Sequence, residues 1–268
     1  MKKKGIKIIS GILIFIIAAC AAYLIYYYYT SYRAESNFDK LRDMVIEMPT
    51  IEYEEDATAN SNTPKMVTID GIMVQEKFEK LYRGNRDFVG WIKIDDTLVD
   101  YPVMHTPNDN ERGEYYIHRD YDQEYSAAGL PFIDKHCMPE VPTDNVIIYG
   151  HNMNSGTMFH DIIRYEDESF FEEHRTFSFD TIYEDGTYEV IAAFYGEILA
   201  DDSEAFKYYE FVNANDEKEF MEFVENVKAM SIYDTGVEVS YGDKLITLST
   251  CAYHVEDGRF AVVAKKIR

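Results

Sequence analysis

The stretch "LITLSTCAYHVEDGRFAVVAKKI", Leu245–Ile267, holds two runs rich in β-branched and aromatic residues, one on each side of a polar loop. The first run ends at Cys251, and Asp257-Gly258 supplies a turn just before Arg259 opens the second run. This pattern predicts an antiparallel hairpin. Because the end of the first strand then faces the start of the second, we expect Cys251 and Arg259 to lie close together.

A thiol beside an arginine suggests a particular chemistry. The guanidinium has a pKa above about 12, so it cannot act as a base near neutral pH. It can stabilise a thiolate, or donate hydrogen bonds to an oxygen that develops negative charge. Cys251 and Arg259 therefore resemble one half of an acyl-transfer site.

The other half of such a site is a proton shuttle. His151 directly follows the apolar run "NVIIYG" and opens a polar loop, which is a suitable position at the end of a strand. His254 is nearer to Cys251 in sequence but falls in the predicted hairpin loop, and spacing alone does not decide between the two. The seven histidines of the chain are His105, His118, His136, His151, His160, His174 and His254.

The rest of the chain is dominated by short strand-like runs separated by turn residues, a pattern typical of a β-barrel or sandwich. An amphipathic stripe over residues 216–230 predicts a core-facing helix, and Val74, Phe78, Leu81 and Tyr82 predict a shorter helix over residues 72–82. The predicted strands are residues 88–94, 97–104, 145–150, 187–196, 237–240, 244–250 and 260–267.

The N-terminal sequence has the pattern of a targeting segment. Four lysines (Lys2, Lys3, Lys4 and Lys7) precede residues 8–32, which carry no charged side chain. Roughly 20 apolar residues can span a bilayer, and flanking lysines favour a cytoplasmic N-terminus. We therefore expect a cytoplasmic segment (1–7), a transmembrane signal anchor (8–32) and a single-pass cell-membrane protein whose remainder is extracellular. A cleaved secretory signal, or lipidation of Cys20 within "IAAC", are the alternatives.

Composition separates two further regions. Residues 33–66 are polar and acidic, with little apolar surface to bury, so we predict a stalk there and a catalytic domain over residues 67–268. The formal net charge is −23, which disfavours binding to nucleic acid phosphates. Cys137 and Cys251 are too few for a disulfide scaffold, and either they form one bridge or at least one thiol is free.

Several motifs together resemble the sortase family of cysteine transpeptidases. They are "TLSTC", the arginine eight positions after its cysteine, "YGHNM" about a hundred residues earlier, "GWIKIDDTLVDYPVM" and "GLPFIDKHC". The resemblance covers roughly residues 74–267. The helix before the cysteine-bearing strand and the N-terminal helices point to the class B branch. The resemblance implies a mostly β fold: a closed barrel of about eight strands, with N-terminal helices and one long inserted helix.

The resemblance also implies a function and a site. Cys251 is the expected nucleophile that forms an acyl-thioester, His151 the general acid and base, and Arg259 the group that holds the substrate carbonyl and the oxyanion. The expected partners are surface proteins with a C-terminal sorting motif, an amine of peptidoglycan (a precursor or cross-bridge), and the membrane through the anchor. No metal or organic cofactor is implied.

Some expectations are less specific. Tyr149, Ser249 and Thr250 flank the proposed catalytic residues and are candidates to bind substrate, although strand packing explains them equally well. Ala252 stands where class B relatives often carry an acid, so no acidic role is carried over to it. The rival functions are hydrolysis or pilin polymerisation at the same site, and a non-catalytic binding domain.

Overall fold

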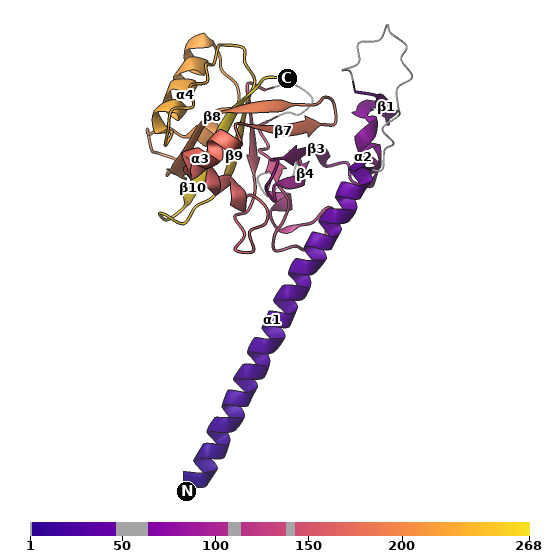
Figure 1. The fold of residues 1–268 in the computed structure, drawn as a ribbon, viewed down its shortest axis with the longest axis vertical. Coiled ribbons are helices and arrows are strands. Elements are labelled where there is room, and N and C mark those ends of the chain that lie inside the picture. Colours follow the sequence, from indigo (N-terminus) through magenta and orange to yellow (C-terminus); the bar gives the residue numbers. More distant parts are fainter. Residues whose placement is uncertain (1, 47–63, 107–113, 138–142) are drawn as a thin grey trace. The chain divides into compact units, whose positions relative to one another are not determined.

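A computed structural model describes residues 2–46, 64–106, 114–137 and 143–268 of the chain (Figure 1). The chain divides into two compact units, Met1–Leu41 and Arg42–Arg268. The described part of the first unit is helical and belongs to α1 (Lys2–Ile46). All the strands that the structure describes belong to the second unit, which contains the predicted catalytic residues.

The apolar N-terminal segment does not meet the expectation of a membrane span. A span needs roughly 20 consecutive, mostly apolar residues in one helix. In the part of the chain that the structure describes, no helix is both long and apolar enough to cross a bilayer. The predicted single-pass membrane location, with its anchor at residues 8–32, is therefore wrong. The predicted stalk includes residues 47–63, which lie outside the described residues.

The second unit is built around a closed barrel of eight strands, which confirms the predicted fold class. Neighbouring strands are antiparallel except for two parallel pairs, β4 (Asp100–Met104) with β5 (Phe132–Ile133) and β6 (Asn145–Tyr149) with β9 (Leu245–Cys251). Closure leaves no unpaired edge strand in this barrel. In barrel order the strands are β10 (Gly258–Lys266), β8 (Thr187–Glu197), β7 (Thr176–Thr181), β3 (Phe88–Lys93), β4 (Asp100–Met104), β5 (Phe132–Ile133), β6 (Asn145–Tyr149) and β9 (Leu245–Cys251).

The predicted long helix is α4 (Glu217–Met230), inserted between β8 and β9 (Figure 1). It begins where the side chain of Asp216 accepts a hydrogen bond from the backbone amide of Glu219 at 2.9 Å, an N-cap. Its apolar face packs against buried residues of β8 and β10, including Phe194 and Val263. Burial of this apolar face holds α4 against β8 and β10. The buried face of α4 consists of Phe220, Phe223, Val224 and Val227.

The predicted helix over residues 72–82 is only half correct. The structure has a hairpin, β1 (Met66–Ile69) and β2 (Ile72–Gln75), before the 3-10 helix η1 (Glu76–Phe78) and α2 (Glu79–Gly84). The turn residues Asp70 and Gly71 have φ values of 51° and 87°, the geometry of a tight hairpin turn. Val74 therefore lies in a strand, and the helical part begins at residue 76.

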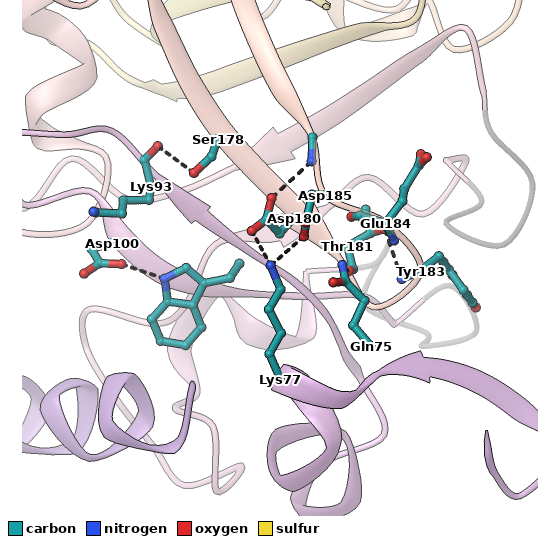
Figure 2. A network of polar contacts seen from close by, with 12 residues as sticks. Gln75, Lys77, Lys93, Asp100, Ser178, Asp180, Thr181, Tyr183, Glu184 and Asp185 are labelled. Carbon is teal, nitrogen blue, oxygen red and sulfur yellow. Dashed lines mark hydrogen bonds and ion pairs between the residues drawn. The ribbon is translucent and has the colours of Figure 1, made fainter. Parts of the chain in front are cut away.

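A polar network ties this hairpin to the barrel (Figure 2). The ammonium of Lys77 contacts Asp180 on β7 and Asp185 in the following turn, each at 2.6 Å. The side-chain amide of Gln75 donates to the backbone carbonyl of Thr181 at 2.7 Å. Since the ion pairs are partly exposed, we expect them to fix the position of the hairpin more than to add stability.

Strand assignment differs from the prediction at three further places. Residues 237–240 are not a strand, and Val237 instead joins the apolar cluster beneath α4. The strands β5 and β7 were not predicted. β7 has the sequence TFSFDT, in which Phe177 and Phe179 are buried and alternate with polar residues. The remaining helical elements are η2 (Tyr115–His118), η3 (His160–Glu166), α3 (Glu168–Glu173) and η4 (Tyr208–Glu210).

Candidate active site

The proposed nucleophile and proton shuttle lie where two parallel barrel strands end. Tyr149 on β6 is paired in register with Ser249 on β9. Cys251 and His151 each lie two residues beyond this pair, at the same end of the barrel. The backbone amide of Gly150 donates to the Ser249 carbonyl at 3.1 Å, which continues the pairing past the end of β6. The parallel pair thus brings together residues that lie 100 positions apart.

Arg259 completes the site from the third strand. It is paired with Cys251 in the β9–β10 register, which confirms the hairpin predicted from the sequence. Its Nη1 donates to the carbonyls of Asp257 at 3.1 Å and Gly258 at 3.0 Å. These bonds fix the guanidinium against its own loop. Among the residues that the structure describes, Nε and Nη2 of this side chain have no hydrogen-bond partner and can donate to a substrate.

His151 is half-buried and held in one orientation. Its Nε2 lies 2.8 Å from the backbone carbonyl of Ile117. Because a carbonyl only accepts, Nε2 carries the hydrogen, and Nδ1 of the neutral ring is the atom that can accept a proton. Burial lowers the pKa of His151 from its usual 6.5; the bond to Ile117 raises this pKa and the nearby His118 lowers it. The neutral ring therefore predominates at neutral pH.

A second contact ties the histidine loop to the cysteine. The side-chain amide of Asn152 donates to the backbone carbonyl of Cys251 at 3.0 Å. Its Oδ1 lies 2.7 Å from Nδ1 of His160, so that nitrogen carries a hydrogen. Asn152 thereby links the ends of β6 and β9 to η3.

The three predicted substrate-binding residues are engaged inside the protein. Ser249 and Thr250 are only 1% and 2% exposed. The Ser249 hydroxyl lies 2.8 Å from the Tyr208 hydroxyl, and the Thr250 hydroxyl donates to the Gly150 carbonyl at 2.7 Å. The hydroxyl of Tyr149 donates to Asp134 at 3.3 Å, and burial raises the pKa of this phenol. Their role in substrate binding stays a prediction.

The other cysteine and the alternative histidine lie in different surroundings. All three cysteines of the chain are free, so Cys137 and Cys251 do not form the bridge that the sequence left open. Cys137 is fully buried, and burial raises the pKa of its thiol to about 12. His254 lies in the β9–β10 loop with the centroid of its ring 4.6 Å from that of Tyr195.

Sequence reasoning missed the contribution of η2. The carbonyl of Ile117 orients His151, and the ring of His118 stacks on it, yet both lie more than 30 residues before His151. No motif marks them, because a backbone carbonyl leaves no signal in the residue type. Asn152 directly follows His151 within "YGHNM", so its identity was visible although its contact with Cys251 was not.

We expect Gly129→Ala to disturb the orientation of His151. Gly129 has φ +58°, and a Cβ there would collide with the Ile117 carbonyl oxygen, the acceptor for Nε2. Backbone strain and the clash should together cost roughly 1–3 kcal/mol of stability. The measurements are thermal unfolding and the ¹⁵N chemical shifts of the His151 ring, which report its tautomer.

Gly236→Ala is the matched control for this change. Gly236 also has a positive φ of +70° but nothing lies within 4 Å of the added Cβ. It should show the backbone strain without the change in tautomer. Equal effects of the two substitutions on the His151 ring would contradict the prediction.

Comparison with known proteins gives the family. A sortase domain model matches residues 92–267. Sortase B of Listeria monocytogenes is 35% identical over 196 residues, which cover 72% of this chain and 75% of that protein. Sortase B from B. anthracis has a structure similar to this one, with a TM-score of 0.72, 26% identity, and coverage of 90% and 99% of the two chains. A Staphylococcus aureus sortase B–substrate complex has a TM-score of 0.71 and 25% identity, over 89% and 98% of the chains.

The family model extends over most of the barrel, the inserted helix and the positions of Cys251, His151 and Arg259. The family model alone covers well over half of the chain. The chain therefore belongs to the sortase family of cysteine transpeptidases, in its class B branch.

Proposed function

We propose that this sortase cleaves the C-terminal sorting motif of a surface protein after a threonine and joins that surface protein to an amine of cell-wall peptidoglycan. The observation that carries the proposal is the register that places Cys251, His151 and Arg259 at one end of the barrel. The similarity to a sortase B that has been solved as a substrate complex supports it.

In the first half-reaction, the sulfur of Cys251 attacks the threonine carbonyl of the sorting motif. Nδ1 of His151 accepts the thiol proton, because Nε2 is committed to the Ile117 carbonyl. The carbon–nitrogen bond then breaks, and His151 returns the proton to the departing amine. The products are a thioester on Cys251 and a released C-terminal fragment.

Arg259 stabilises the oxygen that becomes negative during this attack. Its side chain starts opposite Cys251 and is fixed by two carbonyls of its own loop, so little reorganisation is needed when charge develops. The N–H groups on Nε and Nη2 donate to the substrate oxygen. The guanidinium holds its donors in one rigid plane, whereas the ammonium of a lysine would present three rotatable donors on a flexible chain.

In the second half-reaction, an amine of a peptidoglycan peptide attacks the thioester. His151 removes a proton from the attacking amine and delivers it to the sulfur of Cys251 as the carbon–sulfur bond breaks. A new amide joins the threonine to the amine. The enzyme returns to its starting protonation state.

The test is a cleavage assay with the full chain and a library of quenched-fluorescence peptides that contain a central threonine. Each peptide is incubated without an added amine, with a glycine peptide, or with a lysine-bearing peptide of the pilin type, and the products are identified by mass spectrometry. An amine-linked product supports transpeptidation onto a peptide amine. Hydrolysed product alone, even with excess amine, favours hydrolysis, and a requirement for a lysine-bearing pilin segment favours polymerisation.

A further inference from the structure

The ring of His151 has an ionisable neighbour. The rings of His118 and His151 are stacked, with centroids 5.4 Å apart and planes inclined by 21°. His118 is the last residue of η2 and is exposed to solvent, whereas His151 is half-buried. Ile117, the residue before His118, supplies the backbone carbonyl that binds Nε2 of His151. Two successive residues of η2 therefore contact the same imidazole, one through a hydrogen bond and one through its ring.

Two charges at this separation repel each other. The half-buried position of His151 makes this repulsion stronger than the repulsion between two surface charges. Salt still weakens the repulsion, since His118 is exposed to solvent. Whenever His118 is protonated, protonation of His151 becomes less favourable. The neutral form of His151, which is the form that can accept a proton, is then retained to lower pH.

We propose that His118 is a positioning residue of this site, a second ionisable ring that controls the charge that His151 carries. The proposal rests on the role given to His151 in the proposed function. It extends that role, because it makes the protonation state of the shuttle depend on a residue outside the set of Cys251, His151 and Arg259.

Other ionisable groups approach His151 from different elements. Cys251 ends the neighbouring strand β9, Arg259 lies opposite Cys251 on β10, and His160 of η3 is reached through Asn152. Among the residues that the structure describes, His118 is the histidine whose ring stacks directly on the ring of His151. The pKa of His151 is lowered, as this repulsion predicts. Burial is the largest cause of the lowering, and the charge of His118 adds to it.

The experiment is an NMR titration of the His151 ring in the full chain, for the parent and for His118→Gln, His118→Lys and His118→Glu. We expect the titration midpoint of His151 to fall with lysine and to rise with glutamate, by about 0.5 to 1 pH unit each, with glutamine at or slightly above the parent. Both shifts should shrink in roughly 1 M salt, where the Debye length is about three-fold shorter than at 0.1 M. Because His118 is exposed, all three variants should fold, and the glutamine variant removes the charge while it keeps a planar polar group.

Glu225→Lys on the exposed side of α4 is the control for a change in net charge. It should leave the midpoint of His151 within about 0.2 pH unit of the parent, the order expected for a distant screened charge. Midpoints that are equal in the lysine and glutamate variants of His118 would overturn the proposal. Since the titration is read without any substrate, its result is independent of whether the chain cleaves a sorting motif.

Discussion

Replacing Cys251 with alanine is expected to abolish both peptide cleavage and amine transfer, with a loss on the order of 10⁴-fold or more in kcat. The thiol forms the covalent intermediate of the proposed reaction, and no neighbouring group can replace its sulfur. Cys251 is only half-buried at the end of β9, so its replacement should leave the barrel folded. The measurement is the quenched-fluorescence assay, together with detection of the acyl-enzyme by mass spectrometry.

Cys137→Ala provides the matched control, because it also removes one thiol from the chain. Cys137 is buried, its thiol pKa is raised to about 12, and its sulfur accepts a hydrogen bond from the Ile147 amide at 3.4 Å. The variant should lose about 1–2 kcal/mol of stability and retain activity. Full activity in Cys251→Ala, or loss of the acyl-enzyme in a folded Cys137→Ala protein, would contradict the assignment of the nucleophile.

Replacing His151 with alanine is expected to lower kcat/KM by roughly 10²- to 10⁴-fold, the usual contribution of a general acid and base. The loss should fall on both half-reactions, since the same ring protonates the leaving amine and deprotonates the attacking one. Single-turnover kinetics separate formation of the acyl-enzyme from its breakdown by the amine. A His254→Ala variant, which removes the alternative histidine of the β9–β10 loop, should remain active.

The pH dependence follows from the sign of the shift at His151. Its pKa is lowered in the folded protein, so the acidic limb of kcat/KM should lie below pH 6.5, where the free enzyme loses its neutral imidazole. The unfolded chain binds this proton more tightly than the folded one, so the contribution to stability is complete above about pH 6.5 and is lost as the pH falls from there to the folded pKa. His151→Ala should remove both the acidic limb and this part of the acid sensitivity. An acidic limb that persists unchanged would assign it to another group.

The sequence by itself determined the family and the main features of the barrel. The run from Leu245 to Ile267 was sufficient to place Cys251 opposite Arg259, because two strands joined by a short loop, here residues 252–257, form a local structure whose register depends on that loop. The inserted helix was equally predictable, since an amphipathic stripe with a 3.6-residue period depends on neighbouring residues only. Both features rest on interactions between residues that are close in sequence.

The tertiary structure alone decided what lies around His151. The parallel pairing of β6 with β9 joins segments 100 residues apart, and such pairing is determined by closure of the whole barrel and not by either strand. The carbonyl of Ile117, the ring of His118 and the amide of Asn152 reach the site through that closure. The hydroxyls of Ser249 and Thr250, which looked available along the sequence, are used inside the protein for the same reason. Contacts between distant segments depend on how all the strands pack together, and a linear pattern carries no record of that.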